Sequence, residues 1–134
     1  MVRLEIAAAY AGVNILLLLI LAFRVTSARR KNKVALGDAG NPDVLRAIRV
    51  HANAAEYIPA GIAGITLLAL LEPAAPLWLV HAGGASLTIG RVLHGVGFSM
   101  GVLNIGRMAG TMLTFTALAL IGGGLLWAAF AQQI

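Results

Sequence analysis

Long apolar runs, each sufficient to cross a lipid bilayer, follow one another along almost the whole chain. The 134 residues are 60% hydrophobic and only 11% charged, which excludes a disordered chain and an ordinary water-soluble domain. Since a helix needs about 20 apolar residues to cross a roughly 30 Å hydrocarbon layer, the chain has room for four crossings. We therefore predict an all-α integral membrane protein, a four-helix bundle that occupies residues 1–134 as a single domain. The predicted spans are 4–25, 44–71, 77–98 and 105–130.

The basic residues predict how the spans face. Ten Lys and Arg residues stand against five Asp and Glu, and they lie at the ends of apolar runs, which argues against nucleic acid as a partner. The first loop carries Arg29, Arg30, Lys31 and Lys33, the second loop carries no basic residue, and Arg107 lies beside the third. The positive-inside rule then puts the first and third loops in the cytoplasm and both termini on the outer side.

A few uncharged residues make local predictions. Asn41 is expected to be the N-cap of the second helix, and Asn14, alone in the first span, is expected to form an interhelical hydrogen bond. Two glycine pairs have the spacing of close helix contacts, although 16 glycines in the chain also make such pairs common: Gly97 with Gly101 and Gly106 with Gly110.

Polar residues form a stripe along the second span. They are Arg46, Arg49, Asn53 and Glu56, and at about 100° per residue they share an arc of roughly 80°. An ionised side chain at mid-span costs about 2.5 to 3.5 kcal/mol, so each needs a physical reason to be there. At about 1.5 Å per residue, the stripe is about 15 Å long, which places Glu56 near the middle of the bilayer.

Cations of the third and fourth spans are expected at the same depth. Arg91, His94 and Phe98 share one face of the third span, and Arg107 opens the fourth. Together with the stripe, they predict a cationic, partly buried cavity that suits a ligand with carboxylates. The histidines have no carboxylate at helical spacing, so no metal site is predicted.

Plainer explanations of the charged residues stay open. Arg46 and Arg49 would snorkel to the lipid headgroups, or Glu56 would pair with Arg91 only to orient the helices. The chain has no cysteine, so any thiolate must come from a substrate.

The polar signature of the second span resembles that of a known family. The segment Arg49-Val-His-Ala-Asn53-Ala-Ala-Glu56-Tyr57-Ile-Pro59 is similar to the second-helix signature of the MAPEG superfamily, the membrane-associated proteins in eicosanoid and glutathione metabolism. Ser27-Ala-Arg29-Arg30 resembles the end of the first helix in that family, and Arg91-x-x-His94-x-x-x-Phe98 followed by Arg107 resembles its third-to-fourth-helix region. Short loops and alanine-rich helices make the chain most similar to the bacterial members.

This resemblance implies a homotrimer in the bacterial inner membrane, with glutathione held in a U shape between neighbouring subunits and open to the cytoplasm. Glu56 would take the α-amino group of glutathione and the arginines its carboxylates, while Arg30 or Arg29 would close the site from the first helix. The residues implied to bind glutathione are Arg29, Arg30, Arg46, Arg49, Asn53, Glu56, Tyr57, Arg91 and His94.

The resemblance also implies a reaction. Arg107 matches the arginine that is thought to stabilise the glutathione thiolate, and the implied function is a glutathione-dependent transferase or peroxidase acting on lipophilic electrophiles or lipid hydroperoxides. Two positions depart from the eicosanoid enzymes. Phe98 stands where they commonly have Tyr, and Met108 stands where prostaglandin E synthase has a serine, which argues against that isomerase reaction.

Two other classes of function compete with this one. A non-catalytic membrane binding module for lipid, glutathione or a partner protein is the main alternative, because the family also contains members with no evident catalysis. A small efflux transporter with Glu56 as proton carrier is the second alternative. It would need a site that is reachable from both membrane faces, whereas the polar residues here cluster toward one face.

Overall fold

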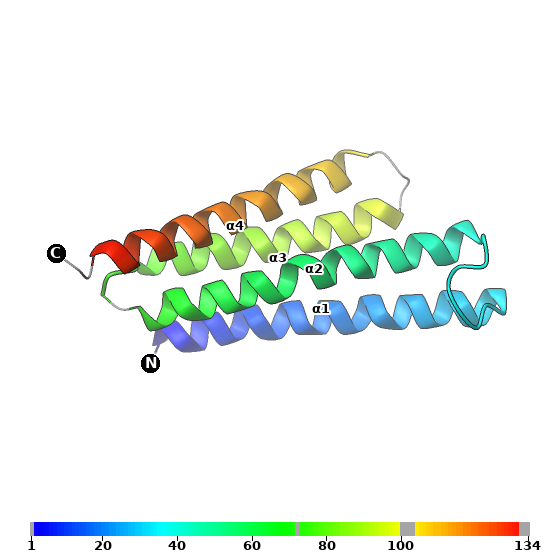
Figure 1. Ribbon diagram of the computed structural model, residues 1–134, viewed down its shortest axis with the longest axis horizontal. Helices are drawn as coiled ribbons and strands as arrows, with labels where there is room; N and C mark the ends of the chain where they lie inside the picture. Colours follow the sequence, from blue (N-terminus) through cyan, green and yellow to red (C-terminus); the bar gives the residue numbers. More distant parts are fainter. Residues whose placement is uncertain (1, 72, 100–103, 132–134) are drawn as a thin grey trace.

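Antiparallel helices make up nearly all of the computed structural model, which describes residues 2–71, 73–99 and 104–131. The helices are α1 (Val2–Asn32), α2 (Pro42–Leu70), α3 (Leu77–Ser99) and α4 (Ile105–Ala131). They run alternately in opposite directions, so the start of α1 and the end of α4 lie at the same end of the bundle (Figure 1). The all-helical prediction is confirmed for the described residues, and the helices agree with the predicted spans to within about two residues except at the end of the first. There the prediction was wrong, because α1 continues past residue 25 to Asn32, so Arg29, Arg30 and Lys31 lie in its last turn and not in the loop.

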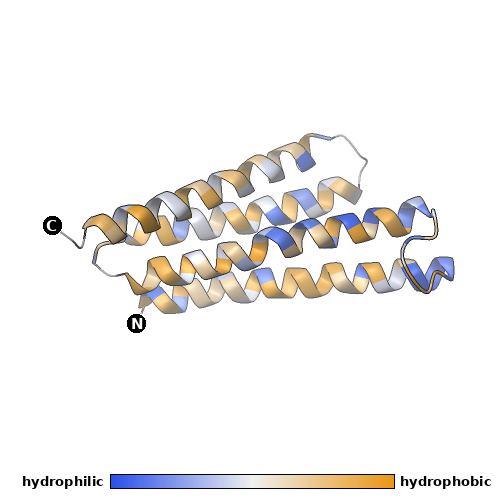
Figure 2. Cartoon of the chain, in the orientation of Figure 1, coloured by the Kyte–Doolittle hydropathy of each residue, from blue (hydrophilic) through white to orange (hydrophobic). Residues whose placement is uncertain are grey.

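The outer surface is largely apolar. Three helices, α1, α2 and α4, are long and apolar enough to cross a membrane; α3 has the length but carries His81, Arg91 and His94. Ile15 and Leu16 on α1 and Trp127 on α4 are all more than half exposed, which is the surface expected where lipid or another subunit is the surrounding medium. Hydrophilic residues gather at the end with the α1–α2 connection and again midway along α2 (Figure 2).

The helices form an open arrangement instead of a closed ring. Within the described residues, α1 contacts α2 and α3, and α4 contacts α3 and α2, but α1 and α4 do not meet. Two apolar clusters hold the bundle. The first includes Ile65, Leu68, Leu87 and Ile121, and the second includes Leu21, Val50, Ala54 and Ile58.

Glycines let α3 and α4 approach each other closely. A Cβ atom placed on Gly110 would lie 2.5 Å from the backbone nitrogen of His94 and 2.6 Å from the carbonyl oxygen of Gly90. A Cβ on Gly106 would lie 3.4 Å from the Cα of Gly97. The predicted close contacts are therefore confirmed for these members of the two pairs, while Gly101 lies outside the described residues.

Asparagine side chains fix helix ends and one helix pair. Asn41 caps α2, as predicted, by accepting from the backbone nitrogens of Asp43 and Val44 at 3.0 and 3.1 Å. Asn104 caps α4 by accepting from the Arg107 backbone nitrogen at 2.9 Å, and its own amide donates to the carbonyl of Gly97 in α3. The predicted interhelical bond of Asn14 is confirmed, since its Nδ2 donates to Thr88 Oγ1 on α3 at 2.8 Å.

The α3–α4 contact leads to a prediction about stability. Gly110→Ala should lower the free energy of unfolding by about 1–3 kcal/mol, because the added methyl meets backbone atoms that cannot move aside independently. Gly122→Ala in the same helix is the matched control, since nothing lies within 4 Å of the Cβ it would add. Thermal unfolding in detergent micelles measures both variants, and equal melting temperatures would contradict the close contact.

Candidate functional site

The buried guanidinium of Arg91 joins three helices. Arg91 is 2% exposed. Its Nε donates to Thr114 Oγ1 on α4 at 2.9 Å, and its Nη1 donates to Asn53 Oδ1 on α2 at 2.8 Å. Its Cζ lies 5.3 Å from the centre of the Tyr57 ring. The buried charge is therefore held by two neutral oxygen acceptors and an aromatic face, which offset part of its desolvation.

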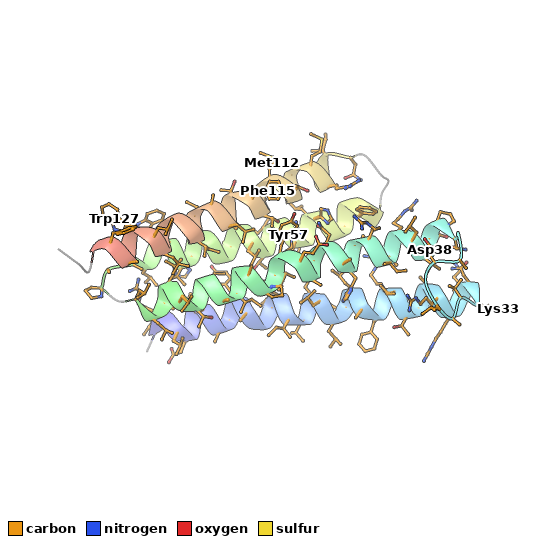
Figure 3. All side chains as sticks on the ribbon, in the orientation of Figure 1. Lys33, Asp38, Tyr57, Met112, Phe115 and Trp127 are labelled. Atoms are coloured by element: carbon orange, nitrogen blue, oxygen red, sulfur yellow. The ribbon has the colours of Figure 1, made fainter. Side chains whose placement is uncertain are left out.

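Tyr57 extends this polar cluster toward α4. Its ring meets the ring of Phe115 edge-on, with 5.9 Å between centroids and an interplanar angle of 66°. Figure 3 shows both side chains midway along the bundle, where α2 and α4 face each other. Because Tyr57 is only half-buried, the cluster reaches from the interior toward the outer surface.

A second group of polar side chains lies around Phe98, near the end of α3 that the charge rule predicts to face the cytoplasm. The rings of His94 and Phe98 lie 5.8 Å apart, and His94 is 5% exposed. The Cζ of Arg107 lies 4.5 Å from the Phe98 ring centre. Phe98 lacks the hydroxyl of a tyrosine, but its ring face supports the guanidinium of Arg107 through a cation–π contact.

The polar stripe of α2 lies across the boundary between interior and outer surface. Arg46 and Asn53 are half-buried, whereas Arg49 and Glu56 are exposed. The predicted arc of roughly 80° explains this division, because Arg46 and Asn53 lie at one edge of the arc and Arg49 and Glu56 at the other. In a single chain, Arg49 and Glu56 therefore face outward, and the predicted partly buried cavity does not enclose them. The alternative pairing of Glu56 with Arg91 is not formed, since Arg91 donates to Asn53 and Thr114.

The remaining predicted cations lie at the polar end of α1 and α2. Arg46 lines a groove of about 500 Å³ between these helices, together with Arg24 and Ser27. Arg29, which is half-buried, and Arg30, which is exposed, line a second concavity of about 340 Å³ at the end of α1. Within one chain, neither concavity includes any member of the Arg91 cluster.

No pattern in the sequence singles out Thr114 or Phe115. Thr114 is fully buried and bonds both to Arg91 and, as a donor, to the Gly110 carbonyl oxygen at 2.8 Å. Nothing in its spacing distinguishes it from Thr111 and Thr116 in the same apolar span. Its position four residues after Gly110 is a signal only once the close contact at that glycine is known.

Comparison with known proteins assigns the chain to a family. The MAPEG family profile matches residues 7–127, a range that reaches into all four helices. The chain belongs to the MAPEG family. It is similar to the inner membrane protein YecN of Escherichia coli strain K12, with 38% identity over 122 residues that cover 91% of each chain. The protein of the same name from Escherichia coli O6:H1 strain CFT073 matches to the same extent. The apolar helices and these relatives identify a membrane protein, and the name of the relatives specifies no reaction.

The Arg91 cluster leads to a second prediction about stability. Thr114→Val keeps the side-chain shape but removes the acceptor for Arg91 Nε, so it should lower the free energy of unfolding by about 1–3 kcal/mol. Thr116→Val is the matched control, because Thr116 is exposed on the same helix and should change stability by less than about 0.5 kcal/mol. Chemical or thermal unfolding in micelles compares them, and equal effects would show that the bond between Arg91 and Thr114 contributes nothing.

Proposed function

We propose that the protein is a glutathione-dependent transferase or peroxidase of the inner membrane, acting as a homotrimer of four-span subunits on lipophilic electrophiles or lipid hydroperoxides. The observation that supports this most directly is the outward position of Arg49 and Glu56. Glu56 lies halfway along α2, a helix long and apolar enough to cross a membrane. Exposure of such ionised groups to hydrocarbon costs about 2.5–3.5 kcal/mol each, and a charged ligand between subunits would remove that cost.

Glutathione has the charges that these residues complement. It carries two carboxylates, one ammonium group and a thiol, so Arg49 would pair with a carboxylate and Glu56 with the ammonium. Asn53 and Tyr57 lie beside them, at the inner edge of the same surface. Arg30 or Arg29 would come from the first helix of a neighbouring subunit, because in a single chain both lie at the far end of α1. The site is thus incomplete in one chain and completed by a second.

Arg107 would supply the charge that activates the thiol. A free thiol has a pKa of about 8.5, and a fixed cation nearby in a low-dielectric site lowers that pKa and favours the thiolate. Arg107 is held for this role by the ring of Phe98 and by the Asn104 cap at its own backbone nitrogen.

The thiolate then reacts in one of two ways. It adds to an electrophilic carbon, forming a carbon–sulfur bond while the leaving group departs with its electron pair. Alternatively it attacks the terminal oxygen of a hydroperoxide. The O–O bond breaks, the alkoxide takes a proton to become an alcohol, and a second glutathione converts the sulfenic acid to the disulfide and water.

The composition of α3 fits a fourth span in this arrangement. Two of its three most polar residues, Arg91 and His94, face the interior, at 2% and 5% exposed, and the third, His81, shares a hydrogen bond with Tyr10 of α1. Lipid would therefore meet mainly the apolar side of α3. With the basic end of α1 in the cytoplasm, the site would open to the compartment that contains glutathione.

Ultraviolet absorbance of the bound thiolate tests the role of Arg107. Addition of glutathione to the purified trimer should produce a thiolate band, and Arg107→Leu should reduce the band about tenfold or more, because loss of the cation returns the thiol pKa toward its free value. Lys31→Gln removes one cation from the exposed end of α1 and should leave the band unchanged. An unchanged band in Arg107→Leu would exclude Arg107 from the mechanism. The wild-type protein would be a binding module if it binds glutathione but shows no thiolate band, does not conjugate a chlorinated nitrobenzene and does not reduce a hydroperoxide.

The role of Glu56 is tested by ligand affinity. Glu56→Gln should weaken glutathione binding about tenfold or more, since a charge-assisted hydrogen bond to the α-amino group is lost. Calorimetric titration measures the affinity, and a glutathione analogue that lacks the α-amino group provides the control, because both proteins should bind it equally. If the variant binds both ligands more weakly by the same factor, Glu56 does not contact the amino group.

A further inference from the structure

The groove between α1 and α2 changes from apolar to cationic along its length. Its lining residues are Ile20, Phe23, Arg24, Ser27, Ala28, Asp43, Arg46, Ala47 and Val50. On α1 the order toward the polar end is Ile20 and Phe23, then Arg24 and Ser27. On the antiparallel α2, Val50 comes first and Arg46 follows. Both walls therefore place apolar side chains toward the membrane interior and an arginine toward the polar end of the bundle.

The apolar part of the groove is open to the outside. Phe23 is 63% exposed and Ile20 is 57% exposed, so these side chains line the groove while remaining accessible from the surrounding lipid. The groove holds about 500 Å³, which is enough for a headgroup and the first part of a hydrocarbon chain. A molecule that matched both ends would be an amphiphile with its charge at the interface.

The charges of the groove select an anion. Arg24 and Arg46 face it from opposite walls, against the single carboxylate of Asp43, which leaves a net positive charge. The Ser27 hydroxyl adds a hydrogen-bond donor on the α1 wall. Arginines at the level of the headgroups attract anionic lipids, and a guanidinium binds phosphate oxygens in pairs.

We propose that this groove binds one anionic phospholipid. Its phosphodiester lies between Arg24, Ser27 and Arg46, and an acyl chain follows Ile20, Phe23 and Val50. Asp43, in the first turn of α2, accepts a hydrogen bond from a headgroup hydroxyl such as that of phosphatidylglycerol. This moves Arg46 from the glutathione site to a lipid site. Arg46 precedes Asn53 by two helical turns, or about 10 Å at 1.5 Å per residue, and Arg46 lines a groove that contains no member of the Arg91 cluster.

Lipid binding to the intact detergent-purified protein tests the proposal by native mass spectrometry. Palmitoyl-oleoyl phosphatidylglycerol should bind at least about fivefold more tightly than the phosphatidylcholine with the same chains, and Arg24→Gln should lower its affinity about fivefold. Arg24→Lys, which keeps the charge, should restore most of the affinity. Lys31→Gln removes a cation outside the groove and should have no effect.

Further measurements distinguish a bound lipid from other molecules that could fill the groove. Phe23→Ala should weaken binding of the intact lipid but not of the deacylated headgroup glycerophosphoglycerol. In the wild-type protein, this free headgroup should compete poorly with the intact lipid. Equal binding of the two lipids, no loss in Arg24→Gln, or equal competition by the free headgroup would each overturn the proposal. A change of oligomeric state in Arg24→Gln with unchanged lipid binding would assign the groove to a second copy of the chain and would also overturn it. Melting temperature and size are recorded for every variant, and Phe23→Ala keeps the test decisive if Arg24→Gln does not fold.

Discussion

The arrangement of the bundle depends on the need to satisfy one buried cation. Arg91 donates to Asn53 and Thr114 and lies over the ring of Tyr57, so α2 and α4 each supply a partner to a charge carried by α3. Thr114 reaches Arg91 because Gly90 and Gly110 allow α3 and α4 to approach closely. Since Asn53 must face inward to accept this hydrogen bond, the rotation of α2 about its axis is fixed. That rotation in turn directs Arg49 and Glu56 outward.

The chain therefore uses its intramembrane cations in different ways. Arg91 is enclosed and holds three helices together. Arg107 lies against an aromatic ring at the start of α4, half-buried, where a ligand can approach it. Arg46 faces Arg24 across a groove between α1 and α2. The surroundings of each arginine thus give it a different role, although the residue type and the depth are similar. Charge alone does not distinguish these roles.

Much of the fold was predictable from the sequence because it depends on length, hydropathy and local chemistry. The lengths of the apolar runs located all four helices, an N-cap was recognised at Asn41, and the isolated polar group of Asn14 indicated an interhelical bond. The site was only partly predictable. Helical spacing placed Asn53 and Glu56 within one arc, but spacing does not determine which edge of an arc faces the interior. The role of Thr114 depends on the distance between two helices, which no local pattern in the sequence records.

The bond between Asn14 and Thr88 has a consequence for the opposite end of α1. Most of α1 is apolar, and apolar contacts alone are not directional, so they do little to prevent the helix from sliding along its neighbours. Asn14 is fully buried and bonded to α3, Tyr10 shares a hydrogen bond with His81 of α3, and Arg3 donates to the carbonyl of Ala75. These polar contacts fix the position of α1 along its axis, and all of them lie in the first half of the helix. A helix is stiff along its axis, so this register also sets the height of Arg24 opposite Arg46. Contacts made by the first half of α1 thus determine which side chains lie opposite each other where the helix ends.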